Sequence, residues 1–422
     1  MNDSILPVVN AGDISQRRLD PVDAETIEQV SMILRNVEYG GTEALQAYAL
    51  KFGDRRPGQP LVLPRSELTK ALSSLGVDRR LLLQRTADRI YNFAQDQRAA
   101  LGEVDVAVEG GRAGHRLIPV DTAGCYAPGG RFPLPSTVLM TAVTARAAGV
   151  SNVWVASPRP STMTLAAAAV AGADNLLAVG GAQAIAAMAF GVGDIPRCDV
   201  IVGPGNRWVT AAKQLVAGKV AIDMVAGPSE LVVLADNSAE AETVALDLLA
   251  QAEHDTDALP VLVTPSEALA QRVRELIDRF LEETPTPTAE EAVRRGFTVL
   301  VQNIEEGVRV CNSLAPEHLE LNLSDPDKII PSLKHYGALF IGSKSAEVLG
   351  DYGTGPNHVL PTAGAARHTG GLSVLNFLRF PTWLRIDDVD EASNLIDEAA
   401  ALARLEGLEW HARAAEKRRS EK

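Results

Sequence analysis

Residues 152–203 read NVWVASPRPSTMTLAAAAVAGADNLLAVGGAQAIAAMAFGVGDIPRCDVIVG. Short apolar runs alternate here with helix-like segments, in the order 152–157, 161–171, 175–180, 182–190 and 198–203. Apolar residues fill each run instead of every second position, which is typical of strands buried on both faces of a parallel sheet. The stretch therefore predicts an α/β fold with helices on both faces of the sheet.

The same alternation extends to both sides of this stretch. It begins with HRLIPV at 115–120 and a helix at 136–148, and a helix at 206–216 closes the first series. A second series follows a Gly-Pro break at 226–229, with strands expected at 230–236, 259–264, 297–302, 318–323 and 337–342. Helices are expected between them, including 266–281, 304–314 and the segment that carries Gln251 and His254. Two doubly wound lobes are the simplest interpretation.

The two ends of the chain have a different pattern. Apolar residues at helical spacing predict helices at 24–36, 42–52 and 79–101, preceded by a loose arm of about fourteen residues. A helix at 389–405 and a short helix around Trp410 form a separate tail.

Composition narrows the class of protein. The 422 residues are 46% hydrophobic and 22% charged, as in globular proteins, and the formal charge of −14 argues against nucleic acid or an anionic membrane as the main partner. Cys125, Cys198 and Cys311 form no CxxC pair, which suggests a reducing compartment. No segment approaches the roughly 20 apolar residues that span a bilayer. We therefore expect a soluble, cytoplasmic protein.

Glycine-rich loops follow several expected strands. Gly180–Ala184 (GGAQA) and Gly203–Asn206 (GPGN) each open an expected helix, where free backbone N–H groups can bind an anion. Neither loop matches GxGxxG, nor does GTGPNH at 353–358. A tight turn that binds nothing explains these glycines equally well.

The histidine and carboxylate positions offer a metal site. Gln251 and His254 are three residues apart, so on a helix both side chains could hold one ion. Further candidates are Glu317, His318, Asp351, His358 and His411. Taken singly, each also has an ordinary structural explanation, because amides and histidines at helix ends are common and Asp often caps a turn.

Eight long motifs occur in one order between Arg17 and His411: CYAPGG, GGAQAIAA, GPGNRWVTAAK, IDMVAGPSE, LAQAEH, APEHL, GDYGTGPNHVLPT and EGLEWH. This set closely resembles the histidinol dehydrogenase family, zinc enzymes that oxidise L-histidinol to L-histidine with two NAD through an aldehyde held on the enzyme. The resemblance implies two incomplete Rossmann-like lobes in an intertwined homodimer. It implies these domains: an arm at 1–14, a zinc and catalytic domain at 15–122 and 231–372, an NAD-binding domain at 123–230, and a tail at 373–422 that reaches the partner.

The resemblance also implies the roles of individual residues. One zinc per subunit would be held by Gln251, His254, Asp351 and the partner's His411, in a mixed nitrogen and oxygen site that suits zinc. His318 would take the proton of the substrate alcohol, and Glu317 would activate water for attack on the aldehyde. The substrate would contact Ser229, Gln251, His254, His318, Asp351, His358, Glu406 and His411. NAD would contact Tyr126, Gln183 and Asn206.

Several positions depart from the family pattern. Arg131-Phe132-Pro133 follows the PGG glycines, Phe380-Pro381 replaces a basic residue, and Trp410 stands beside the last zinc ligand. These changes leave the ligands and bases in place but bear on the shape of the substrate pocket. Arg131 or Arg367 could serve an anionic substrate group, although a surface arginine is the simpler reading. The alternatives are therefore a paralogue that oxidises another amino alcohol or a sulfonated diol, like sulfopropanediol dehydrogenase, or a metal-binding scaffold without activity.

Overall fold

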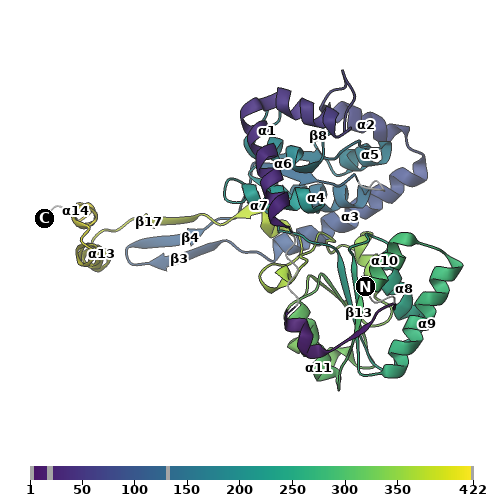
Figure 1. Cartoon of the computed structure of the whole chain (residues 1–422). Coiled ribbons are helices and arrows are strands. Elements are labelled where there is room, and N and C mark those ends of the chain that lie inside the picture. The colour runs from purple at the N-terminus through teal and green to yellow at the C-terminus, as the bar shows by residue number, and fades with distance from the viewer. Residues whose placement is uncertain (1–3, 17–21, 130–133, 420–422) are drawn as a thin grey trace.

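A computed structural model describes residues 4–16, 22–129 and 134–419, which form two α/β lobes and a projecting arm (Figure 1). The first lobe contains a sheet of six strands in the order β10-β9-β6-β7-β8-β2. Its strands are β2 (Val62–Pro64), β6 (Thr122–Tyr126), β7 (Asn152–Ala156), β8 (Asn175–Leu177), β9 (Val200–Val202) and β10 (Ala221–Ile222). All neighbours are parallel except β2, which pairs antiparallel with β8.

The chain winds this sheet in two directions. It moves from β6 through β7 to β8, and β9 then returns to the other side of β6. Counted along the parallel strands, the order is 3-2-1-4-5, as in a Rossmann fold that lacks its last strand. Such a reversal opens a crevice at the carboxyl ends of the strands, here between β6 and β9.

Helices cover both faces of the first sheet. They are α1 (Ala24–Lys51), α2 (Arg65–Ser74), α3 (Val77–Ala99), α4 (Pro135–Ala148), α5 (Thr162–Val170), α6 (Gly181–Phe190) and α7 (Arg207–Val216). One core lies under α3, α4 and α5, and the other lies under α1, α6 and α7. We expected residues 15–122 to share a domain with 231–372. The structure differs, because α1, α2 and α3 pack on the helices of the first lobe.

The second lobe repeats the winding. Its sheet has the order β1-β13-β12-β11-β14-β15, all parallel. The strands are β1 (Val8–Val9), β11 (Glu230–Ala235), β12 (Leu259–Thr264), β13 (Phe297–Leu300), β14 (His318–Asn322) and β15 (Ala338–Ile341). The helices are α8 (Ala241–Ala252), α9 (Glu267–Glu283), α10 (Pro287–Arg295), α11 (Ile304–Leu314) and α12 (Glu347–Asp351). The described N-terminal residues are not a loose arm, since β1 extends this sheet and Leu6 is buried.

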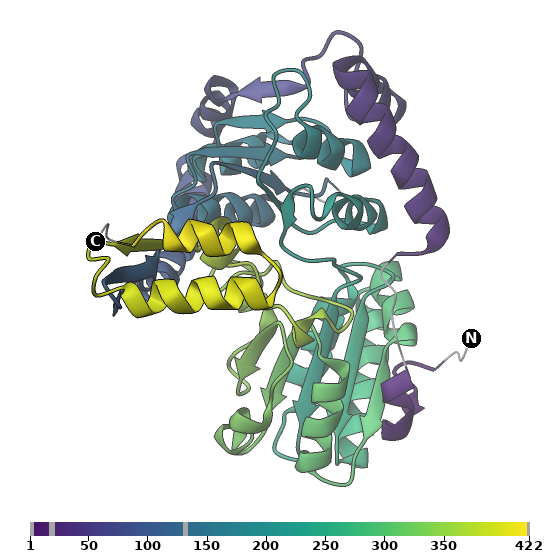
Figure 2. The same ribbon diagram turned by 90° about the vertical axis from the view of Figure 1, so that its left-hand side faces the viewer.

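The projecting arm, which is distinct from the N-terminal residues, contains an antiparallel sheet. Its strands are β3 (Val104–Val108), β4 (Gly111–His115) and β17 (Thr382–Ile386). It carries α13 (Ser393–Leu405) and α14 (Glu409–Glu416) away from both lobes (Figures 1 and 2). The two tail helices were predicted correctly. The expected strand at 115–120 was wrong, because β5 (Ile118–Pro119) pairs with β16 (Leu378–Arg379) at the base of the arm and not with the main sheet.

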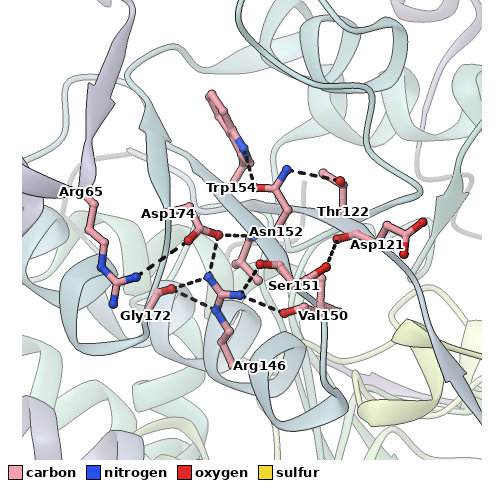
Figure 3. A network of polar contacts seen from close by, with 11 residues as sticks. Arg65, Asp121, Thr122, Arg146, Val150, Ser151, Asn152, Trp154, Gly172 and Asp174 are labelled. Carbon is pink, nitrogen blue, oxygen red and sulfur yellow. Dashed lines mark hydrogen bonds and ion pairs between the residues drawn. The ribbon is translucent and has the colours of Figure 1, made fainter.

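A polar network holds the first sheet together at the amino ends of its strands (Figure 3). The Arg146 guanidinium, at the end of α4, donates to the carbonyl groups of Val150, Ser151 and Gly172 and pairs with Asp174 at 2.6 Å. Asp174 also accepts a bond from the Val153 amide. These bonds fix the loops at this edge, and the opposite edge is left for binding.

No described helix is both long and apolar enough to cross a lipid bilayer.

Candidate active site

A cleft of about 1720 Å³ lies between the lobes. From the first lobe it is lined by residues at the carboxyl ends of strands, such as Tyr126 on β6 and Gly203 after β9. From the second lobe it is lined by residues at amino ends, such as Ser229 before β11 and His318 at the start of β14. The crevice of the first lobe therefore faces polar side chains supplied by the second.

Glu317 and His318 are both buried where β14 begins. His318 Nδ1 donates to the Glu230 carbonyl at 3.0 Å, so its proton sits on Nδ1 and the lone pair is on Nε2. Burial lowers the pKa of His318 to about 4, so the ring is neutral near pH 7. His318 Nε2 has no hydrogen-bond partner among the described residues, and it lies 3.8 Å from Asp351 Oδ1. This nitrogen is therefore a free base in the cleft.

The Glu317 carboxylate is also fixed by Glu230. Its Oε2 accepts a 2.9 Å bond from the Glu230 backbone amide. Burial raises the pKa of Glu317 well above its usual range, and the nearby charges of Glu230 and Asp351 add to the rise. A carboxyl group whose pKa is raised is a stronger base than an ordinary carboxylate, which suits proton transfer.

Two of the expected metal ligands, His254 and Asp351, come close to each other. Asp351 ends α12, and its Oδ2 lies 4.0 Å from Nε2 of His254, which follows α8. Gln251 is 0% exposed, yet neither atom of its amide has a hydrogen-bond partner among the described residues. Buried amides normally have partners, so an unpaired one three residues before His254 is a candidate cation ligand.

Glu347 was missed by the sequence reasoning. It lies one turn before Asp351 on α12, and His318, Glu347 and Asp351 bring ligand atoms within 4.8 Å of one another. Burial raises the pKa of Glu347 well above its usual range, and the charge of Asp351 is the next largest cause of this rise. The sequence did contain a signal, because Glu347 and Asp351 are four residues apart and such a spacing places both carboxylates on one face of a helix.

The expected ligand His411 and substrate contact Glu406 lie elsewhere. His411 is exposed on α14 and Glu406 is exposed at the end of α13, both on the projecting arm. Neither lines the cleft of its own chain.

Most of the other expected substrate contacts line the cleft, namely Ser229, His254, His318, Asp351 and His358, whereas Gln251 is not among its lining residues. His358 Nδ1 donates to the Asp351 carbonyl at 2.9 Å, and Thr137 Oγ1 lies 3.2 Å from its Nε2. Burial lowers the pKa of His358. Ser229 lies in the loop before β11, next to Glu230.

Tyr126, Gln183 and Asn206, the expected NAD contacts, all line the first lobe's side of the cleft. The Tyr126 hydroxyl accepts a bond from the Gly181 amide, and the Gln183 side chain donates to Asp54. Asn206 caps α7 by accepting bonds from the amides of Trp208 and Val209. Gly203 has φ of +116° and its Cα packs against the Tyr126 carbonyl, so any side chain there would collide with backbone.

The residues that depart from the family pattern lie away from the cleft or outside the described residues. Residues 131–133 are outside the described part of the chain. Arg367 donates to the carbonyl groups of Asn312 and Ser313, and Phe380 packs edge-on against His115. Trp410 is 77% exposed on the arm, beneath Arg413.

Two Rossmann-like sheets that enclose buried proton-transfer groups define an α/β enzyme of the dehydrogenase kind. Residues 16–419 match the family model described as histidinol dehydrogenase. The histidinol dehydrogenase of Thermus thermophilus is 44% identical over 93% of this chain and 95% of its own, and that of Nitrosomonas europaea is 40% identical over 94% and 93%. The crystal structure of histidinol dehydrogenase from Elizabethkingia anophelis, 31% identical, covers 98% of both chains with a TM-score of 0.90. The chain belongs to the histidinol dehydrogenase family.

Proposed function

We propose that this chain oxidises L-histidinol to L-histidine with two NAD and one zinc ion per subunit. The observation that carries the proposal is the neutral His318, whose unpaired Nε2 faces Asp351 in the cleft. A zinc ion, when bound, would orient the substrate through its imidazole and amino nitrogens. Gln251, His254 and Asp351 would hold it, and their unpaired or closely spaced ligand atoms support this set.

Each base would perform one kind of proton transfer. His318 Nε2 would accept the proton of the substrate hydroxyl as hydride leaves the adjacent carbon for NAD. Glu317 would take a proton from water as the water attacks the aldehyde carbon, giving a diol. A second hydride transfer from the diol would give the carboxylate product. The Glu230 backbone supports these roles, because its amide donates to Glu317 and its carbonyl accepts from His318, so that both side chains are held in place.

We further propose a homodimer in which the arm completes the partner's site. The helices of the arm expose several large apolar side chains, namely Leu395, Leu402, Leu405, Leu408 and Trp410, and Leu405 is 85% exposed. A monomer rarely exposes such a group, and a second copy of the chain would cover it. The partner's arm would then supply His411 and Glu406 to the cleft.

The experiment is to measure NADH formed per L-histidinol consumed by zinc-loaded protein, with sulfopropanediol in parallel. We expect two NADH per histidinol, and no activity after chelation. Reduction of NAD with the sulfonated diol but not with L-histidinol would indicate the sulfopropanediol dehydrogenase-like paralogue. Binding of zinc without NAD reduction on either substrate would favour the scaffold without activity.

A further inference from the structure

The carboxyl group of Glu230 has no part in the steps above, although the Glu230 backbone is bonded to both proposed bases. Glu230 begins β11, is 6% exposed, and follows Ser229, which lines the cleft. We propose that Glu230 is a positioning residue for the reaction. Its carboxyl group anchors residues 352–364, the loop after α12, and thereby sets the distance between this loop and the two bases. The inference rests on the proposed function, which assigns those bases.

The two bases are held by a single residue. The Glu230 amide donates to Glu317 Oε2 at 2.9 Å, and the Glu230 carbonyl accepts a 3.0 Å bond from His318 Nδ1. Both are backbone groups, so their positions follow the start of β11 and cannot be adjusted by a change of rotamer. A displacement of this strand end would therefore move the partners of both bases together.

The side chain of Glu230 joins this strand end to the loop. Its Oε1 accepts a 2.9 Å bond from the Ala363 amide. Ala363 has a φ of +54°, in the left-handed region that residues other than glycine rarely adopt. A bond from its amide to a buried carboxyl group stabilises this conformation. The conformation of the loop at Ala363 therefore depends on Glu230.

The same carboxyl group also faces the backbone of one base. Burial raises the pKa of Glu230 to about 7, and the amides of Ala363 and Glu317 partly oppose this rise. The contact is reciprocal, because the Glu317 carboxylate accepts the Glu230 amide. Each of these two residues thus holds the backbone of the other, which fixes Glu317 relative to the loop.

The loop carries groups that would bind the substrate. His358 lies within it and donates from Nδ1 to the carbonyl of Asp351, an expected zinc ligand that ends α12. The loop is bonded to the segment before β11 at a second point, since the Gly227 amide donates to the Thr362 hydroxyl. Glu230 therefore lies between the groups that would hold the substrate and the groups that would move its protons.

The separation of these two sets of groups bears directly on the reaction rate. Proton transfer needs donor and acceptor about 3 Å apart, and a misplacement of about 1 Å can slow a reaction by roughly 10²-fold. Glu230→Ala frees the Ala363 amide and lets the loop and the strand end move apart. We expect kcat for L-histidinol to fall by about 10²-fold. KM should change by less than about threefold and zinc content should stay unchanged, because every substrate contact and proposed ligand is still present.

Steady-state kinetics of matched variants tests this split between kcat and KM. Glu230→Gln keeps an oxygen that can accept the Ala363 amide, and its kcat should stay within about fivefold of wild type. Glu320→Ala removes another buried carboxyl group of the same sheet, one that does not line the cleft, and should lower kcat by at most about threefold. Equal losses of kcat in Glu230→Ala and either of the other two variants would overturn the proposal.

A combined variant distinguishes positioning from a general loss of active protein. Glu317→Gln already lacks the base that would activate water, so adding Glu230→Ala should lower its steady-state rate by no more than about threefold. If the two losses multiply, Glu230 acts independently of Glu317 and the proposed role is wrong.

Hydrogen–deuterium exchange measures the anchor without any substrate. The Ala363 amide, followed in peptides that cover residues 358–364, should exchange about tenfold faster in Glu230→Ala than in wild type. Its exchange in Glu230→Gln should match wild type. Unchanged exchange in Glu230→Ala would overturn the proposal. If Glu230→Ala does not fold, Glu230→Asp replaces it in every comparison, because its carboxyl group is one methylene further from the Ala363 amide.

The two proposals can fail separately. If wild type does not oxidise L-histidinol but amide exchange responds to Glu230→Ala as expected, the proposed function fails while the anchor stands. If wild type oxidises L-histidinol and Glu230→Ala keeps its kcat, the reaction stands and the positioning role fails.

Discussion

At the scale of residues, His318, the proposed base for the substrate alcohol, also affects stability. Burial lowers its pKa from the ordinary 6.5 to about 4, so between these values the unfolded chain binds more protons than the folded chain. The stability contributed by a neutral His318 is therefore present above about pH 6.5 and is lost as the pH falls toward 4. We expect the free energy of unfolding of wild type, relative to His318→Gln, to fall by on the order of 3 kcal/mol between pH 7 and pH 4.

Denaturant unfolding at several pH values measures this difference. The buried carboxyl groups shift stability in both proteins alike, so they cancel in the comparison. His368→Gln is the control, because His368 is exposed. A difference between wild type and His318→Gln that stays constant from pH 7 to pH 4 would contradict the prediction.

Glu317 is predicted to act after the first hydride transfer. Glu317→Gln keeps an oxygen that can accept the Glu230 amide, but it cannot take a proton from water. We expect the steady-state rate to fall by about 10²- to 10⁴-fold, as for loss of a general base. A rapid-mixing experiment should still show one NADH formed per site before turnover stalls.

Zinc content measured by atomic absorption provides the control for this variant. It should equal that of wild type, since Glu317 is not among the proposed ligands. An unchanged rate of alcohol-to-acid conversion would rule out Glu317 as the base that activates water.

The candidate site could be predicted from sequence only in part. The spacing of Gln251 and His254 pointed to one helix end, and the family motifs placed Glu317, His318 and Asp351 at the same cleft. Glu347 was missed although its four-residue spacing from Asp351 was visible, because only its contact with His318, a residue distant in sequence, gives that spacing a meaning. Single-residue patterns cannot report such contacts.

At the scale of elements, a buried ion pair fixes the loop between β9 and α7. Lys213 on α7 donates to the Gly203 carbonyl at 2.9 Å and pairs with Asp223, which accepts the Gly203 amide. The backbone amide and carbonyl of Gly203 are therefore both hydrogen-bonded to this buried ion pair. Asn206, an expected NAD contact, lies three residues later.

We expect Lys213→Met to lower the free energy of unfolding by about 3–5 kcal/mol, because it leaves the Asp223 carboxylate buried without a counter-ion. Adding Asp223→Asn should recover part of the loss, which denaturant unfolding would measure. Lys219→Met is the matched control, since Lys219 forms an exposed pair with Glu38 and should change stability by at most about 1 kcal/mol. Similar losses in both single variants would contradict this role for the pair.

Most helices and strands of the two sheets followed from the sequence, because buried parallel strands are continuous apolar runs. The helix at α4 and the strands β7, β8 and β9 lie where they were expected. The N-terminal strand β1 and the strand at 115–120 were misjudged, since two-residue pairings carry no periodic signal. The domain assignment of α1, α2 and α3 failed for a related reason, because periodicity does not say which sheet a helix covers.

At the scale of the whole molecule, the proposed sharing of the site between two subunits predicts complementation between inactive variants. Glu317→Gln and His411→Asn should each be nearly inactive as homodimers. In a mixed dimer, one of the two sites combines intact bases with an intact His411. Unfolding and refolding of an equal mixture should therefore restore about a quarter of the wild-type activity.

Mixing two preparations of the same variant is the control. This mixture should restore no activity. If the mixture of the two variants also stays inactive although mixed dimers are detected by mass, each chain would have to complete its own site, and the proposed exchange of arms would be wrong.

The two sheets face the cleft with opposite ends of their strands, and this arrangement has a kinetic consequence. Only the first lobe presents strand carboxyl ends, with Tyr126 and the Gly203 loop, whereas the second presents amino ends that carry the bases. Within the described chain, a nucleotide therefore has one docking edge, although the proposed reaction consumes two. The first NADH must depart and a fresh NAD must arrive while the half-oxidised substrate stays behind. Retention of the aldehyde through that exchange, and not the speed of either hydride transfer, is what the second lobe has to secure.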